Sequence, residues 1–174
     1  MSAEDLTREL TAYACAKLTS HLAQIVRCAG LLNEAELWQR ANEHCNSVGN
    51  LILHLTGNIR QWIVAGIGGE PFRRDRPAEF AARGPRPAGE IVGALESTVR
   101  RAGAIIAGLD AEALGVRRTI QGYDVSALVA VWHVVEHCSF HTGQIVHLTK
   151  VMKNVDLSVY DAEGRRIAAH ESAP

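Results

Sequence analysis

The sequence of 174 residues lacks the features typical of disulfide-stabilised and secreted proteins. Only four cysteines are present, with no CxxC pair and no framework spacing, so disulfide bonds are not expected to hold the fold together. The first ten residues, MSAEDLTREL, are acidic, whereas a secretory leader begins with basic residues followed by an apolar run. We therefore expect a reduced, cytoplasmic protein, and we interpret Cys138 as a small buried apolar side chain.

Long apolar runs and an excess of basic charge are absent as well. No stretch of about 18 uncharged apolar residues occurs, so no membrane-spanning helix is expected. The 18 Lys and Arg residues stand against 19 Asp and Glu residues, which gives a net charge of −1. Because the sequence also shows no basic face, nucleic acid is not an expected partner.

The chain does contain a strong helical pattern. Apolar side chains recur at steps of three and four residues, which is typical of amphipathic helices. Four long helices are predicted, over residues 4–29, 47–66 and 87–109, and from a cap at Asp124 or Ser126 to about Asn154. A short helical piece is expected over residues 34–40, and an extended piece over residues 116–123.

Residues 67–89 interrupt this pattern, because they are rich in glycine and proline and contain five arginines. The segment is interpreted as a connection and not as a domain boundary, since neither half of the chain has enough helices to bury a core alone. Residues 1–174 are therefore predicted to form a single all-α domain. Its expected architecture is a four-helix bundle with a long irregular connection between the second and third long helices.

Three of the eight histidines lie in one segment of the fourth long helix, WHVVEHCSFHTGQ. His133, His137 and His141 are spaced by four residues, so they share one face of an α-helix. Two histidines one turn apart can direct ring nitrogens at a single divalent ion. The outer two lie about 12 Å apart at roughly 1.5 Å per residue, which is too far for one ion. The pair is therefore either His133 with His137 or His137 with His141.

The second long helix offers a third ligand. His54 lies between Leu51 and Leu55 on the apolar face, where a single histidine is usually a hydrogen-bonded core residue. The pair on another apolar helix changes this interpretation, because a pair needs a further protein ligand before it holds a metal well. A site of three neutral histidines leaves the ion an open position, which favours activation of a thiol or a water molecule.

Two segments resemble a known family. NSVGNLILHLTGNIRQWI in the second long helix and HVVEHCSFHTGQI in the fourth resemble the DinB/YfiT-like metal-dependent proteins. The resemblance covers most of the chain and implies a four-helix bundle. The metal ligands of that family are one histidine from the second helix and an HxxxH pair from the fourth, which correspond here to His54, His137 and His141.

The resemblance also implies a cofactor, a chemistry and an assembly. Family members bind one divalent metal ion, zinc or nickel, and are often homodimers. Some are transferases or isomerases that use low-molecular-weight thiols such as bacillithiol, mycothiol or glutathione, and others are described as hydrolases. We therefore expect a metal-dependent thiol S-transferase or hydrolase with a small-molecule substrate. A homodimer would form through small residues that flank two apolar stripes, namely Ala12, Ala16, Ala23, Gly93, Gly103 and Ala107.

Other polar residues are expected near the site. Carboxylate-bearing thiols would find bidentate partners in the connection, at Arg73, Arg74 and Arg76. The pocket or the surroundings of the ligands are expected to include Asn50, Asn58, His133, Glu136 and Gln144. Three further histidines are not expected to bind the ion. His21 is placed beside the apolar stripe of its helix, at the edge of the stripe or on the surface, His44 in a loop and His170 in the polar tail.

Two alternative functions stay open at this point. The ion at three histidines is also compatible with a non-catalytic metal-binding or stress-related structural protein. In addition, His133 to His137 spell HxxEH, the inverted zinc-peptidase motif, in which Glu136 would act as base. The third ligand would then be Glu163 or Glu171 in the polar tail, and a helical bundle is not the context in which this motif is expected.

Overall fold

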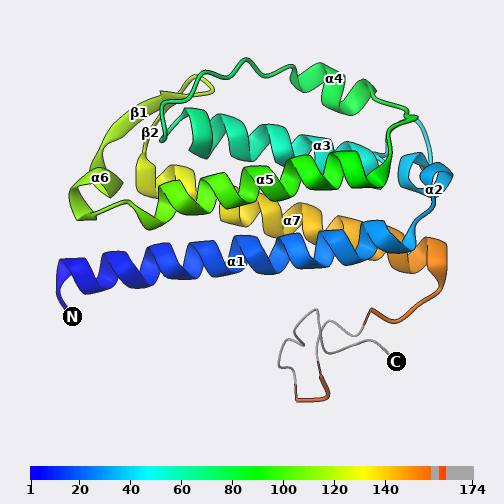
Figure 1. Ribbon diagram of the computed structural model, residues 1–174, viewed down its shortest axis with the longest axis horizontal. Coiled ribbons are helices and arrows are strands. Elements are labelled where there is room, and N and C mark those ends of the chain that lie inside the picture. Colours follow the sequence, from blue (N-terminus) through cyan, green and yellow to red (C-terminus); the bar gives the residue numbers. More distant parts are fainter. Residues whose placement is uncertain (158–160, 164–174) are drawn as a thin grey trace.

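Four long helices run side by side in the computed structural model, which describes residues 1–157 and 161–163 (Figure 1). They are α1 (Ala3–Leu31), α3 (Val48–Ile59), α5 (Ala88–Ala107) and α7 (Ala127–Lys153), and a π-helical segment, Arg60–Ala65, continues α3. Both α1 and α3 pack against α5 and α7. The predicted all-α four-helix architecture is therefore confirmed, and α3 and α7 are neighbours.

Serine side chains begin three of these helices. Ser2, Ser47 and Ser126 each accept a hydrogen bond from the backbone N–H three residues further on, which satisfies one of the free donors of the first turn. The Asn50 side chain completes the cap of α3, because its Oδ1 accepts a hydrogen bond from the Ser47 backbone N–H. The helix predicted from residue 47 is thus capped by Ser47, and of the two caps predicted for the fourth long helix the structure shows Ser126, so these serines fix where the two histidine-bearing helices start.

Short elements join the long helices. The expected helical piece is α2 (Glu34–Trp38), and α6 (Ala111–Gly115) precedes α7. The expected extended piece is a hairpin of β1 (Arg117–Ile120) and β2 (Tyr123–Ser126), paired antiparallel from Arg117↔Ser126 to Ile120↔Tyr123. Its two turn residues, Gln121 and Gly122, both have positive φ, as a tight two-residue hairpin turn requires.

The connection between α3 and α5 is more ordered than the sequence predicted. It contains a short helix, α4 (Arg76–Ala81), which packs on the outer side of α3 (Figure 1). Asn50 Nδ2 donates hydrogen bonds to the backbone carbonyls of Glu79 and Ala82, and the Arg40 guanidinium donates to the Phe80 carbonyl. The predicted long connection thus contains one short helix that the sequence did not predict, and polar side chains of α3 and of the preceding loop hold its backbone in place.

The core is built from aliphatic side chains of all four long helices. Its largest fully buried members include Leu18, Leu51, Leu55, Ile91 and Ile145. Cys138 is buried as expected, and burial raises the pKa of its thiol to about 12, so it packs as an apolar group. None of the helices in the described part of the chain is long and apolar enough to span a membrane.

Two expectations about burial are wrong. His21, predicted at a boundary or on the surface, is buried within α1, with 9% of its area exposed. The apolar residues of α7 lie nearly all round the helix, which predicts burial on most sides, but Val129, Trp132 and Phe140 are 49%, 43% and 63% exposed. The apolar pattern of α7 marks residues that tolerate burial, and only the packing of α1 and α3 decides which of them are covered.

Candidate metal centre

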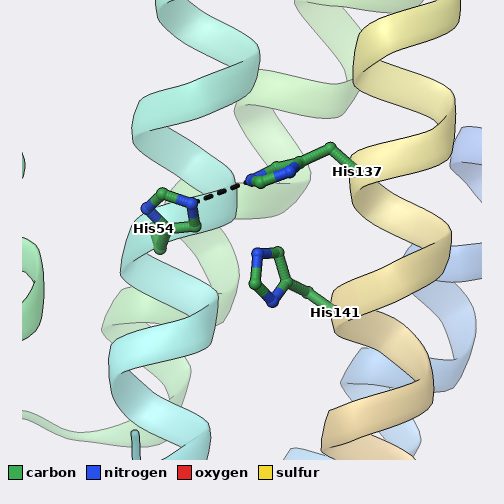
Figure 2. Close-up of side chains that lie close together, drawn as sticks. All are labelled: His54, His137 and His141. Carbon is green, nitrogen blue, oxygen red and sulfur yellow. Dashed lines mark hydrogen bonds between the residues drawn. The ribbon is translucent and has the colours of Figure 1, made fainter.

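Helices α3 and α7 bring three histidines together inside the bundle (Figure 2). His54 projects from α3, and His137 and His141 project from α7 toward it. His54 Nε2 and His137 Nε2 are 2.8 Å apart, and one ligand nitrogen from each of the three rings lies within 4.8 Å of the others. In the part of the chain that the structure describes, this is the one group of three or more potential ligands with such a geometry.

His133 lies outside this cluster. Its ring stacks on His137 with a centroid distance of 5.5 Å, and it also lies 4.0 Å from the ring of Trp62. Asn58 Nδ2 is 3.3 Å from His133 Nε2, so these two residues pair with each other one turn away from the cluster. Of the two pairs that the spacing left open, the structure places His137 and His141 together with His54.

The donor set fits a divalent ion. Two nitrogens bound tetrahedrally at about 2 Å from zinc are separated by about 3.3 Å. The observed separations, from 2.8 Å to at most 4.8 Å, lie around this value. Burial and the neighbouring imidazoles lower the pKa of His137 to about 3, and burial also lowers the pKa of His141. Both rings are therefore neutral at pH 7, which is the form that binds a metal.

Each of two ligands has a hydrogen-bond partner on its other nitrogen. His141 Nδ1 lies 2.7 Å from Gln144 Oε1, so the nitrogen carries the proton and the amide oxygen accepts it. His54 Nδ1 lies 2.9 Å from Glu79 Oε2. Such partners orient a ligating imidazole and fix which nitrogen carries the proton. Gln144 was expected near the site, whereas Glu79 was not.

Glu79 belongs to a buried ion pair. Arg74 Nε donates to Glu79 Oε1 at 2.7 Å, and Arg74 Nη2 donates to Glu79 Oε2 at 2.8 Å. The two side chains are only 5% and 10% exposed. Burial by itself would raise the pKa of Glu79, but the hydrogen bonds from Arg74 and His54 outweigh it and lower that pKa. The carboxyl group is therefore ionised at pH 7.

The role expected for Arg74 is corrected by this pairing. Its guanidinium also donates to Gln61 Oε1 and to the His54 carbonyl, so it is engaged by the protein and is not free to bind an anionic substrate. Arg73 and Arg76 are exposed, and the Arg76 guanidinium lies over the ring of Phe80. No local pattern links Glu79 to His54, because 25 residues separate them and the connection has no helical period that spans this distance.

Asn50 and Glu136 have different places from those expected. Asn50 caps α3 and holds the connection, so it acts on the site only through the segment that carries Glu79. Glu136 is exposed and lines a groove between α1 and α7 together with Tyr13, Lys17 and Phe140. A base in the HxxEH arrangement would have to face the ion, so this position does not support the peptidase motif. Glu171 lies outside the described residues.

A cavity lies beside the histidine cluster. It has a volume of about 320 Å³ and is lined by His44, Cys45 and His147, among others. Gln144 lines this cavity and also contacts His141, so the two sites share a wall. The ring of Phe80 packs against the His54 ring at a centroid distance of 4.7 Å.

Comparison with known proteins places the fold in a family. The model of a family of proteins of unknown function, DUF1572, matches residues 5–162. A crystal structure of a DinB-like protein from Bacillus subtilis is 15% identical, with a TM-score of 0.65 over 89% of this chain and 99% of that one. A DinB-like protein from Bacillus cereus is 16% identical, with a TM-score of 0.62 over 77% and 87% of the two chains.

A conserved protein from Enterococcus faecalis is also similar in fold, with 16% identity and a TM-score of 0.61 over 89% of this chain and 99% of that chain. No curated protein matches the sequence. At these identities the solved structures show a shared fold, while the family model covers most of the chain. The chain therefore belongs to the DUF1572 family, and its fold is similar to that of the DinB-like proteins.

Proposed function

We propose that this protein is a metal-dependent enzyme whose three-histidine site binds one divalent ion, zinc or nickel, and activates a thiol or a water molecule. The observation that carries the proposal is the convergence of three ligand nitrogens within 4.8 Å of one another. Three neutral imidazoles leave the charge of the ion uncompensated and one coordination position open, and an ion in this state lowers the pKa of a thiol or water that binds it.

The surroundings of the triad support a small-molecule substrate. The cavity that shares Gln144 with the site has the volume of a small metabolite and not of a peptide segment. Exposed Arg73 and Arg76 in the connection offer cationic partners for the carboxylates of a low-molecular-weight thiol. Thiol S-transfer is preferred over hydrolysis because of the family resemblance, and the proposed compartment is the cytoplasm.

A structural, non-catalytic metal site is the second candidate. One observation favours it, since His54 and His141 are only 4% and 9% exposed and the Phe80 ring covers His54. Such a site would fasten α3 to α7 without binding a substrate. It would raise the stability of the protein by the linkage between metal binding and folding, with no requirement for an accessible open position.

Metal analysis and a thiol screen distinguish these functions. Purified protein should contain about one equivalent of zinc or nickel by mass spectrometry of metals, and His137→Ala should contain none. The loaded protein is then incubated with bacillithiol, mycothiol or glutathione and an electrophilic acceptor, and separately with activated esters. Turnover that disappears in His137→Ala supports the enzyme. Stoichiometric metal that raises the melting temperature without any turnover supports the structural site, and absence of metal rejects both.

A further inference from the structure

A buried acidic side chain from the connection between α3 and α5 lies behind the His54 ring. Glu79 Oε2 is 2.9 Å from His54 Nδ1, while His54 Nε2 points toward His137 on the other side of the ring (Figure 2). A neutral imidazole carries one proton, and the partner on one nitrogen decides where that proton resides. A carboxylate accepts a hydrogen bond and cannot donate one, so Glu79 favours the proton on Nδ1 and leaves the Nε2 lone pair facing the site.

Arg74 has a competing contact with the same nitrogen. Its Nη2 lies 3.1 Å from His54 Nδ1, and donation along this contact would favour the opposite tautomer. Nη2 already has a better acceptor in Glu79 Oε2, at 2.8 Å, and a further acceptor in the His54 carbonyl. Because the carboxylate is closer to Nδ1 and is charged, the hydrogen bond from His54 to Glu79 prevails.

The ion pair also keeps the net charge next to His54 at zero. Arg74 and Glu79 neutralise each other within hydrogen-bonding distance, so the pair adds no net charge behind His54. Without Arg74, a buried carboxylate would lack a compensating charge, which is costly in a protein interior. Arg74 therefore allows the Glu79 carboxylate to stay ionised although it is buried. Because the pair has no net charge, it would not neutralise the charge of a cation bound at the histidines.

The absence of a side chain at Gly57 makes this arrangement possible. A Cβ atom at position 57 would collide with Glu79 Oε1 and would lie 2.9 Å from Arg74 Nε. Gly57 lies within α3, where glycine costs about 1 kcal/mol relative to alanine. The helix thus contains an unfavourable residue at a position where the ion pair closely approaches its backbone. In contrast, a Cβ at Gly103 of α5 would meet no atom within 4 Å.

We propose that Glu79 is the positioning residue of His54, held in place by Arg74 and by the close approach to Gly57, and that it fixes the ring with Nε2 free to bind the ion. The inference rests on the proposed function in that it assigns a supporting residue to the same metal site. In this proposal the connection between α3 and α5 supplies the carboxylate that orients His54 of α3.

The test combines two variants with matched controls. Glu79→Gln removes the charge of the acceptor, and Gly57→Ala displaces the carboxylate without changing any polar group. The controls are Glu90→Gln, which neutralises an exposed carboxylate paired with Arg86, and Gly103→Ala, which adds a methyl group in open space. Zinc affinity is measured by competition with a chelator. The tautomer of His54 is read from nitrogen NMR of the metal-free protein.

The expected result is a loss of zinc affinity of about 10- to 100-fold in Glu79→Gln and in Gly57→Ala, with no change in the controls. The metal-free wild type should show His54 with its proton on Nδ1, and the two variants should lose this preference. Wild-type affinity and an unchanged tautomer in both variants would overturn the proposal.

The experiment also covers a variant that fails to fold and a wild type that binds no metal. If Glu79→Gln fails to fold because Arg74 loses its partner, the double variant Arg74→Met with Glu79→Gln removes both charges, and wild-type affinity in that variant overturns the proposal. If the wild type binds neither zinc nor nickel, the proposed function fails. The NMR measurement then still decides whether Glu79 positions His54, because it needs no metal.

Discussion

The Nε2 atoms of His54 and His137 lie 2.8 Å apart, although 83 residues separate these histidines in the chain. Without a bound ion, one of these nitrogens carries a proton that the other accepts, so at least one lone pair is directed into the cluster; a bound ion would take the lone pairs of both. A third nitrogen, from His141, lies within 4.8 Å of both rings. The site is therefore arranged around a point between two helices, and each ligand can be removed separately to test it.

The ligand set predicts a specific pattern of metal loss. Replacement of His137 by alanine should abolish stoichiometric metal, because this ring belongs to every candidate pair and lies at the centre of the cluster. His44→Ala and His170→Ala should retain about one equivalent, although residue 170 lies outside the described part of the chain. Metal content is measured on purified protein. If His133→Ala removes the metal while His141→Ala keeps it, the proposed ligand set is incorrect.

The stability of the metal-free protein should fall in acid. Burial, followed by the charges of His141, His54, His133 and Arg74, lowers the pKa of His137 from 6.5 to about 3. Below pH 6.5 the unfolded chain binds a proton at His137 and the folded chain does not. The free energy of unfolding is therefore unaffected by this residue above about pH 6.5 and falls progressively as the pH is lowered toward 3. Urea denaturation at several pH values measures it, and His137→Gln should flatten the slope. An equally steep slope in that variant would assign the acid sensitivity to other groups.

Substitution of buried Arg74 should destabilise the protein, whereas substitution of exposed Arg73 or Arg76 should not. Arg74→Met should lower the free energy of unfolding by about 3–5 kcal/mol, because it leaves Glu79 buried without its partner. Charge reversal at exposed Arg73 or Arg76 should leave stability within about 0.5 kcal/mol. If a carboxylate-bearing thiol is a substrate, these two reversals should raise its apparent dissociation constant about two- to five-fold and weaken the salt dependence of binding. An unchanged constant at both positions would show that the connection does not contact the substrate.

A homodimer remains a prediction, and the structure indicates a surface for it. Ala12 and Ala16 of α1 are exposed beside Leu6 and Tyr13, and the nearby groove between α1 and α7 also exposes Trp132. A two-fold contact would bury this apolar area against itself. Sedimentation at micromolar concentration should give twice the chain mass of 18.9 kDa.

Variants at the surface test the same interface. Tyr13→Glu should convert the dimer to a monomer, because it places a charge in the apolar contact. Val151→Glu is the matched control, since Val151 is also an exposed apolar residue, at 67% against 51% for Tyr13, and lies near the C-terminal end of α7. A wild-type species of one chain mass would remove the dimer from this interpretation.

The helices and the histidine pair of α7 could be predicted from the sequence because both depend on local geometry. The four-residue spacing of His137 and His141 places them on one helix face whatever surrounds the helix. Ser47 and Ser126 mark helix starts because a capping side chain bonds to a backbone N–H only three residues away. Even the pairing of α3 with α7 followed from His54 lying on an apolar face that must be buried.

Tertiary structure alone decided which groups surround those ligands. Glu79 reaches His54 across 25 residues, and Arg74 reaches Glu79, because α4 docks on α3 at Gly57. His21 is buried and Phe140 is exposed, against expectation, because burial depends on which helices pack against a face and not on the polarity of the residue. The sequence by itself determined the local periods and caps, whereas contacts between distant segments required the packing that brings them together.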